Sequence, residues 1–343
     1  FSVIILSQHT TFVKSYFHMV LKWRLSLLFG SEKRLLPLLM SKKVIIYDVS
    51  LRDGSHAISH QLTKEQISLY AKGAEESNLY AIEVGHGNGI GASSILVGES
   101  KLTDEIMLKT AKEQLCNTKL GIHIIPGCAT INKDLKKAIE CGVDIFRVAS
   151  HCTEADVTQR HISFARENGK EAYGLLMSSH MTTPEILLEE AFKMQTYGAQ
   201  AIVILDSSGS FLPSDVEKII TLLSNNLSVP VGFHGHNNLS LSVYNSIVAL
   251  QAGAQIIDAS IKGFGAGAGN TPLEVLVGVL TKYNFDTGID LYKVLDLADL
   301  AEEKLIEKPI TISPLSIVGG LSSVFSAFSN QIKTVSREYN VDP

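Results

Sequence analysis

Eight short apolar segments alternate with amphipathic segments along this 343-residue chain, and the alternation predicts a (β/α)8 TIM barrel. The segments are rich in Val and Ile, their starts lie 25 to 40 residues apart, and polar side chains gather where they end. The expected strands are residues 44–48, 80–85, 120–125, 145–150, 172–177, 201–206, 229–234 and 256–261. A doubly wound sheet is the alternative, but Leu51-Arg52-Asp53-Gly54 after the first strand is not the Gly-rich fingerprint that it needs.

Helices are expected between the strands, because residues 63–76 and 184–197 repeat apolar side chains at helical spacing. Thr63 is the expected N-cap of the first of them, and Ser210 or Ser214 is expected to cap the helix after the sixth strand. Helix ends are expected at Gly142, Gly169, Gly198 and Gly253.

Both ends of the chain differ from the barrel pattern, which we place at residues 40–285. Residues 1–39 hold five basic residues and one acidic residue, and Met40 lies just before the first strand. We expect a natural start at Met40 and a non-native or disordered extension before it, although a transit peptide also fits that composition. Residues 286–343 are expected to form a small, truncated helical region, with helices at 291–305 and 322–339 and interruptions at Pro309 and Pro314.

Composition narrows the class of protein. With 45% hydrophobic residues and a formal charge of −5, the chain can bury a core of barrel size and has no basic run for nucleic acid. It has no apolar span of 18 residues, so we expect no membrane segment. The four cysteines include no CxxC pair, which argues against a zinc ribbon and favours free thiols in the cytoplasm.

Polar residues collect at the carboxyl ends of the predicted strands, where the active sites of such barrels form. In strand order they are residues 48–56, then Glu83, His86 and Asn88, then His123, then Arg147, Ser150 and His151, then residues 178–180, then Asp206 and Ser207, then His234 and His236, and finally Lys262. Their agreement across the repeated units predicts an enzyme.

Asp53, His234 and His236 are the candidate metal ligands. The two histidines lie two residues apart on a strand, so their side chains leave on the same face. A pair of hydrogen-bonded core histidines is the alternative, but Asp53 offers the missing carboxylate. Mixed nitrogen and oxygen ligands suit Mn²⁺, Mg²⁺, Fe²⁺ or Co²⁺, with Zn²⁺ possible, and such an ion acts as a Lewis acid on a carbonyl oxygen.

Three neighbours of that cluster are candidates for the chemistry. Arg52 is placed to stabilise a developing enolate, or else pairs with Glu83 or Asp48 for structure. His56 is the candidate general base, with His60 as a competitor. The hydroxyl of Ser207 would bind a substrate carboxylate or keto oxygen, or else cap the following helix.

The segment after the eighth strand leaves two interpretations open. The Gly-rich run 263–270 would hold an anion with its backbone N–H groups or simply form a tight turn. Lys262 would form an imine with a keto acid, or else point outward as a solvated side chain. A complete set of metal ligands makes the imine redundant.

From residue 42 to about residue 339 the chain resembles the 4-hydroxy-2-oxovalerate aldolases, the pyruvate aldolases among the metallolyase barrels that include HMG-CoA lyase and isopropylmalate synthase. The resemblance is carried, in order, by DVSLRDGSH at 48–56, EVGHGNG at 83–89, SHCTEAD at 150–156, MSSHM at 177–181, HGHNNLS at 234–240 and GAGAGN at 265–270.

The resemblance implies a metal-dependent cleavage of 4-hydroxy-2-oxopentanoate to pyruvate and acetaldehyde through a pyruvate enolate, in the meta-cleavage catabolism of aromatic hydrocarbons. It implies that Asp53, His234 and His236 hold Mn²⁺ and that Arg52 stabilises the enolate. His56 would take the proton of the C4 hydroxyl, and Ser207 would lie near the pyruvate moiety.

The resemblance also implies a partner, an acylating acetaldehyde dehydrogenase that receives the aldehyde through a channel and contacts the C-terminal helical region. In this chain Phe325 stands where the family places a Tyr near the channel mouth, so Phe325 is a possible gate. The rivals are a Claisen-type lyase or synthase acting on a CoA ester, and a catalytically silent scaffold subunit. His56 argues against the first, since the CoA-ester relatives carry Gln there.

Overall fold

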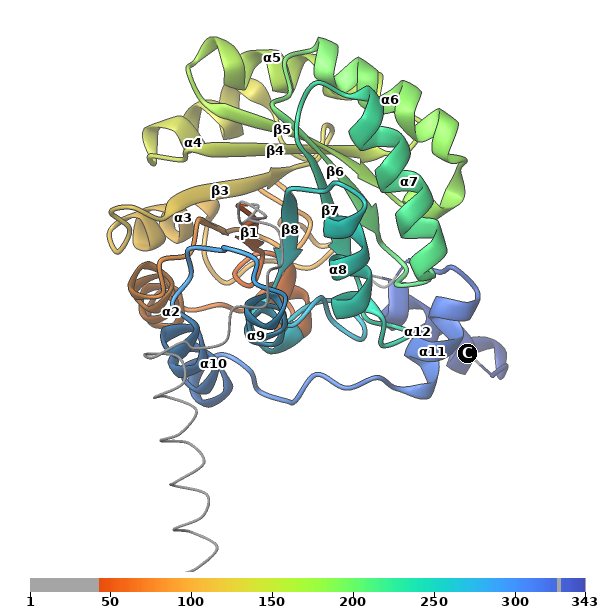
Figure 1. Cartoon of the computed structure of the whole chain (residues 1–343). Coiled ribbons are helices and arrows are strands. Elements are labelled where there is room, and N and C mark those ends of the chain that lie inside the picture. The colour runs from red at the N-terminus through yellow and green to blue at the C-terminus, as the bar shows by residue number, and fades with distance from the viewer. Residues whose placement is uncertain (1–42, 326–327, 343) are drawn as a thin grey trace, which may run out of the picture. The chain divides into compact units, whose positions relative to one another are not determined.

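The computed structural model describes residues 43–325 and 328–342. Eight parallel strands close into a barrel in sequence order, with the first strand paired to the last (Figure 1). The strands are β1 Ile45–Asp48, β2 Ala81–Glu83, β3 Lys119–Ile124, β4 Ile145–His151, β5 Glu171–Met177, β6 Ala201–Asp206, β7 Val231–Gly235 and β8 Ile256–Ala259. The predicted barrel is confirmed, and each strand overlaps the segment expected for it.

Helices cover the outside of the barrel. They are α2 Lys64–Glu76, α3 Asp104–Lys112, α4 Lys136–Glu140, α5 Gln159–Glu167, α6 Pro184–Thr196, α7 Pro213–Asn226, α8 Ser242–Gln251 and α9 Leu273–Lys282. Short helical turns lie at η1 Asp53–Ile58, η2 Ile131–Leu135, η3 Ala155–Thr158, η4 Ser179–Met181 and η5 Ile261–Gly263. The apolar faces of the helices and the outward side chains of the strands form the larger hydrophobic cluster. The near-continuous apolar strands follow from burial on both faces.

Local capping chemistry explains where several helices begin. Thr63 caps α2 as predicted: its hydroxyl accepts from the backbone N–H of Gln66, whose side chain accepts from the N–H of Thr63. The cap predicted for α7 was wrong, because Leu212 occupies that position and Asp215 accepts from its N–H at 2.9 Å. Pro213 at the first helical position needs no N–H partner, which moves the start of the helix away from Ser214.

The C-terminal region partly matches its prediction. Helix α10, Leu291–Lys304, forms where it was expected and packs against α2 and α9. Pro314 does not merely interrupt the chain but opens α11, Pro314–Leu321, capped by Ser313. The helix predicted for 322–339 is present only as α12, Ser329–Tyr339, and Ser323 has a φ of 54° in the turn before it.

The expectations for residues 1–39 lie outside the described residues, and the boundary at 285 stays a prediction. No helix in the described part of the chain is both long and apolar enough to cross a bilayer.

Inside the barrel, side chains form an apolar lower part and a polar upper part. Successive inward positions on β3 include Gly121 and His123, because side chains alternate along a strand. The lower part is filled by residues such as Tyr47 and Tyr173. Gly121 leaves room for Tyr47, since a Cβ there would lie 1.6 Å from its hydroxyl oxygen.

We expect Gly121→Ala to lower the free energy of unfolding by about 1–3 kcal/mol, because the added methyl group cannot avoid the buried Tyr47 ring. The matched control is Gly278→Ala in α9, where an added Cβ meets nothing within 4 Å. That change should stabilise the protein by about 0.5–1 kcal/mol through helix propensity. Urea denaturation of both variants measures the difference, and equal effects would contradict this account of the barrel interior.

Candidate active site

The turn after β1 carries two charged side chains into the mouth of the barrel. Arg52 and Asp53 are both buried, and Asp53 begins the short helix η1. Gly54 follows because the chain runs close to Phe264 at this point: a Cβ on residue 54 would lie 2.1 Å from that ring. The Arg-Asp-Gly sequence therefore combines two functional groups with the one residue that allows the loop after β8 to pack beside them.

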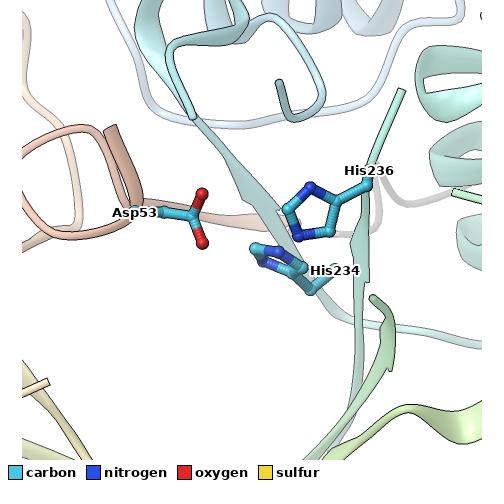
Figure 2. A group of neighbouring side chains, drawn as sticks. All are labelled: Asp53, His234 and His236. Atoms are coloured by element: carbon cyan, nitrogen blue, oxygen red, sulfur yellow. The ribbon is translucent and has the colours of Figure 1, made fainter. Parts of the chain in front are cut away.

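Asp53 meets two histidines from the end of β7, which is separated from β1 by β8 in the closed barrel. One ligand atom from each of Asp53, His234 and His236 lies within 4.8 Å of the other two, and Figure 2 shows the three side chains converging. The Nδ1 of His234 is bound to Asp258 Oδ2 at 3.0 Å, so its Nε2 is the atom left for a ligand. His236 has a buried Nδ1 with no hydrogen-bond partner among the described residues. One carboxylate and two imidazoles with these free positions fit a divalent cation.

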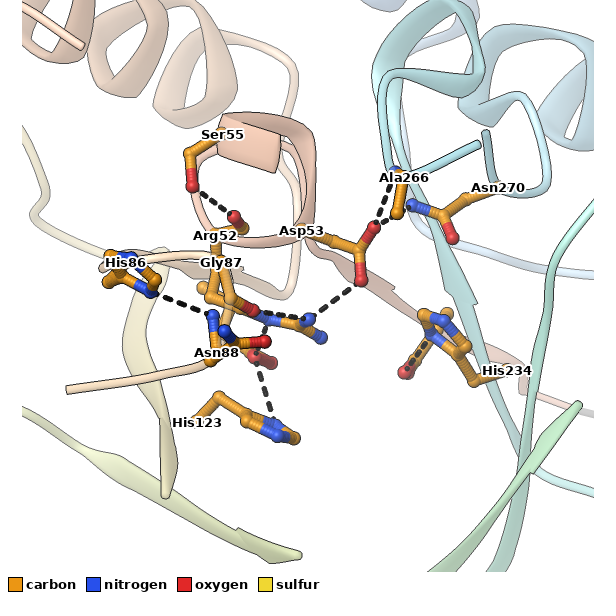
Figure 3. Close-up of polar contacts among 12 residues, drawn as sticks. Arg52, Asp53, Ser55, His86, Gly87, Asn88, His123, His234, Ala266 and Asn270 are labelled. Carbon is orange, nitrogen blue, oxygen red and sulfur yellow. Dashed lines mark hydrogen bonds and ion pairs between the residues drawn. The ribbon is translucent and has the colours of Figure 1, made fainter. Parts of the chain in front are cut away.

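A buried chain of alternating charges links the two sides of this cluster. Starting from Asp53, it runs through Arg52, Glu83, Arg147 and Asp258 to His234, and we call it the charge chain. Arg52 contacts Asp53 and Glu83, both at 2.7 Å. Arg147 contacts Glu83 and Asp258, both at 2.6 Å. Figure 3 shows Arg52 between Asp53 and the side of the barrel that holds His123. Every carboxylate therefore faces at least one guanidinium.

Asp53, Glu83 and Arg147 stay ionised in spite of burial, because each faces an opposite charge. Burial alone raises the pKa of Asp53, but Arg52 and the neighbouring histidines lower it well below its usual range. For Glu83, burial is likewise outweighed by Arg52 and Arg147, which lower its pKa to about 2. Burial lowers the pKa of Arg147, whereas Asp258 and Glu83 raise it above its ordinary value. These three groups are thus charged although they are buried.

Asp258 and the inward position of Arg147 are the parts of the site that sequence reasoning missed. Arg147 was noted only as a residue at a strand end, but it is the third residue of β4 and is fully buried. The available signal was a charged residue at an inward position of an otherwise apolar strand, as in Ile256-Ile257-Asp258.

The Gly-rich run after β8 donates hydrogen bonds to the carboxylate of Asp53. The side chain of Asn270 donates to Asp53 Oδ1 at 2.9 Å, and the backbone N–H of Ala266 donates to the same atom at 3.3 Å. A Cβ on Gly265 would lie 2.8 Å from that oxygen. Both earlier interpretations therefore hold in part, because the segment is a tight turn and its amides orient a carboxylate.

His56 lies in η1, three residues after Asp53, and lines the same cavity as the cluster. Its ring packs on Gly87, where a Cβ would approach the ring nitrogen Nε2 to 2.5 Å. Burial, opposed by Asp53, lowers the pKa of His56 below its usual value, so the neutral, proton-accepting form dominates near neutral pH. The competitor His60 stacks on His86 with ring centroids 3.6 Å apart and does not line the cavity described next.

The predicted site residues surround one cavity of about 100 Å³. It is lined by Arg52, Asp53, His56, Ser207, His234, His236 and Phe325, together with Gly87, Asn88, His123, Ile125, Met177, Leu205 and Ala266. Pockets for drug-sized ligands are several times larger, so this one suits a small substrate.

The contacts of Ser207 and Lys262 distinguish between the two roles considered for each: substrate contact or helix cap for Ser207, and imine formation or an outward side chain for Lys262. The N–H of Ser178 donates to Ser207 Oγ at 2.9 Å, which leaves the Ser207 hydroxyl proton available to a ligand. Ser207 does not cap α7, which begins after Leu212. Lys262 pairs with Glu302 of α10 at 2.6 Å, and that contact raises its pKa, so it is neither in the cavity nor poised for an imine.

Comparisons with known proteins agree with this geometry. The HMGL-like family model matches residues 43–301. The 4-hydroxy-2-oxovalerate aldolase of Pectobacterium atrosepticum is 58% identical over 304 residues, covering 89% of each chain, and that of Spirochaeta aurantia is 52% identical over 300 residues, covering 88% of each. The carboxyl transferase domain of Rhizobium etli pyruvate carboxylase superposes with a TM-score of 0.72 at 16% identity, covering 88% of this chain and 55% of that one, which supports the fold alone. The chain therefore belongs to the HMGL-like family, together with the relatives named 4-hydroxy-2-oxovalerate aldolase.

Proposed function

We propose that this chain is a divalent-metal-dependent aldolase that cleaves 4-hydroxy-2-oxopentanoate to pyruvate and acetaldehyde. The observation that carries the proposal is the meeting of Asp53, His234 and His236 with Arg52 and His56 around one small cavity. The 58% identity to an aldolase of that name supports the choice of substrate. The role proposed for the chain in meta-cleavage catabolism of aromatic compounds follows from that substrate.

The metal is proposed to be Mn²⁺, held by Asp53, His234 and His236. A divalent cation in this position supplies Lewis-acid polarisation of a bound keto oxygen. Asp258 holds the ring of His234 from behind, and Asn270 and Ala266 hold Asp53, so the ligand atoms are oriented before an ion arrives.

Arg52 is proposed to stabilise the pyruvate enolate. Its guanidinium is fixed by Asp53, by Glu83 and by the carbonyl oxygen of Gly87, which accepts from its Nη1 at 3.2 Å. A cation held in place by three contacts does not reorganise when negative charge develops beside it, and this is the condition for effective electrostatic stabilisation. Ser207 would donate its free hydroxyl proton to the carboxylate or keto oxygen of the same fragment.

His56 is proposed to take the proton of the C4 hydroxyl. Loss of that proton allows the bond between C3 and C4 to break, so that acetaldehyde leaves and its bonding electrons remain on the pyruvate fragment as the enolate. Protonation at C3 then completes pyruvate. Since its pKa is lowered by burial, His56 is in the accepting form when substrate binds.

An acylating acetaldehyde dehydrogenase is the proposed partner, and Phe325 is the proposed gate for the aldehyde. What supports a partner on the C-terminal helices is their exposed apolar side chains, among them Leu321, Val335 and Tyr339. The proposed location is the cytoplasm, and free cysteines at 116, 128, 141 and 152 are consistent with it. Co-purification with full-length dehydrogenase from the native host tests the first proposal.

Pyruvate release from 4-hydroxy-2-oxopentanoate, followed with lactate dehydrogenase, should disappear after chelation and return with Mn²⁺.

Asp53→Asn should lower Mn²⁺ occupancy, because the cluster loses its charged ligand. His56→Ala should keep the metal and lose rate by ~10²–10⁴, the usual contribution of a general base. Absence of metal-dependent pyruvate release would defeat the proposed function, and an empty metal site in His56→Ala would defeat the role of that residue.

Asp258→Asn should weaken Mn²⁺ binding by about 10–100-fold, because Asp258 orients a ligand histidine and also neutralises Arg147. Asp48→Asn is the matched control, since Asp48 is also a buried carboxylate but bonds to Ser50 and Tyr70 outside the cavity. Isothermal titration of both proteins with Mn²⁺ measures the effect. The role of Asp258 in orienting His234 is contradicted if the two variants bind Mn²⁺ equally well.

Phe325→Tyr should change the stereochemical preference or the aldehyde selectivity more than the affinity for Mn²⁺. Phe325 lines the cavity but is not among the residues that converge on the metal position. A new hydroxyl there would meet the aldehyde fragment. Product stereochemistry and Mn²⁺ affinity are measured for both proteins, and loss of metal binding with unchanged selectivity would contradict the gate.

A further inference from the structure

His123 is a buried side chain of the cavity that the proposed mechanism does not use. It lies on β3 with 3% of its surface exposed and lines the cavity beside Arg52. Among the described residues its Nδ1 has no hydrogen-bond partner, and it lies 3.6 Å from Glu83 Oε1. Since Nδ1 faces Glu83, Nε2 is the ring nitrogen of His123 that remains for a ligand in the cavity.

The surroundings of His123 decide which hydrogen-bonding capacity it offers. Burial and the nearby Arg52 lower the pKa of His123 to about 3, so its ring is neutral near neutral pH and carries one proton. Glu83, whose pKa is lowered to about 2, is ionised and faces Nδ1. A carboxylate at that position favours the proton on Nδ1, and Nε2 then keeps a lone pair that can only accept.

The barrel order places His123 away from the metal cluster. Ser207, His234 and His236 come from the ends of β6 and β7, whereas Asn88 and His123 come from β2 and β3. Arg52 follows β1, which stands between β2 and β8 in the closed barrel, and Figure 3 shows His123 and His234 in different directions from the Arg52 guanidinium. His56 packs on Gly87, on the same side as His123.

This division orients the substrate of the proposed reaction. The keto acid end belongs with the metal cluster, Arg52 and Ser207, and the C4 hydroxyl belongs with His56. Atoms beyond C4 therefore extend toward the wall of the cavity that contains His123 of β3 and Ile125, which directly follows that strand. The remaining side chains of that wall, Met177, Leu205 and Phe325, are apolar.

We propose that His123 is a specificity-determining residue that accepts a hydrogen bond from a hydroxyl group on the aldehyde-derived end of the substrate. The inference rests on the proposed function and extends its substrate class to 4,5-dihydroxy-2-oxo acids. With 4,5-dihydroxy-2-oxopentanoate the same bond between C3 and C4 breaks, and the products are pyruvate and glycolaldehyde. No further reactant is needed, since the two products contain all the atoms of the substrate.

The test compares kcat/KM for 4,5-dihydroxy-2-oxopentanoate and 4-hydroxy-2-oxopentanoate, two substrates that differ by one hydroxyl group. Pyruvate is measured with lactate dehydrogenase in the Mn²⁺-loaded protein. In His123→Asn the amide reaches only the position of Nδ1, so the ratio of the two kcat/KM values should fall by about tenfold, the contribution of one hydrogen bond. In His123→Gln the amide oxygen reaches the position of Nε2, and the ratio should recover. Both replacements are polar and neutral, so the comparison does not depend on burying a new charge.

Ile125→Val is the control, because it trims the same wall without touching a hydrogen bond and should change both substrates alike. An unchanged ratio in His123→Asn, or an equal loss in the Asn and Gln variants, would overturn the role of His123. Failure of the wild-type protein to cleave 4-hydroxy-2-oxopentanoate would instead overturn the proposed function, and the inference with it. Activity on 4-hydroxy-2-oxopentanoate, the substrate without the C5 hydroxyl, thus distinguishes the two failures.

Discussion

The site depends on one arrangement of charge, the buried chain from Asp53 through Arg52, Glu83, Arg147 and Asp258 to His234. Each member is at most 5% exposed, so an unpaired charge among them would cost several kcal/mol. A pair of this kind does not by itself make a protein more stable, since desolvation offsets much of the attraction. Its effect is positional, because each carboxylate and each guanidinium has a partner in only one geometry. The barrel supplies that geometry by bringing β1, β2, β4, β7 and β8 to one mouth.

The charge chain also positions two of the three proposed metal ligands, Asp53 and His234. Asp53 is held by Arg52 on one oxygen and by the Gly-rich loop on the other. His234 is held by Asp258, which is held in turn by Arg147. The two halves of the cluster approach from opposite ends of one network, so a change at Glu83 in the middle would be felt at both. Tyr47 supports the network from below, with its ring centroid 4.1 Å from the guanidinium carbon of Arg147.

The cavity residues around Arg52 fall into two groups that come from different strands. The side toward β6 and β7 holds His234 and His236, which are proposed to bind the metal, together with Ser207, and the side toward β2 and β3 holds Gly87, Asn88 and His123. Two glycines of the cavity wall lie so close to side chains of the site that a Cβ would clash with them. Gly87 leaves space for the ring of His56, and Gly265 leaves space for Asp53 and Asn270. The cavity between the two sides is small, so selectivity depends on a few wall residues and not on a large binding surface.

Apart from Phe325, which was expected only from the family resemblance, the amino-acid sequence alone was enough for the barrel, for the order of its strands, and for six cavity residues from Arg52 to His236. These follow from local rules, since apolar strands alternate with helices at a fixed spacing and polar residues mark the carboxyl ends of the strands. Only the tertiary structure decided which buried charges touch. Asp258 and Arg147 are 111 residues apart and meet because β4 and β8 both face the barrel axis, a pairing that no periodicity encodes. Tertiary contacts likewise made Lys262 a partner of Glu302 and gave the Gly-rich loop Asp53 as its anion. The reason is physical: spacing along the chain sets which face a side chain occupies, whereas its partner is set by the closure of the barrel.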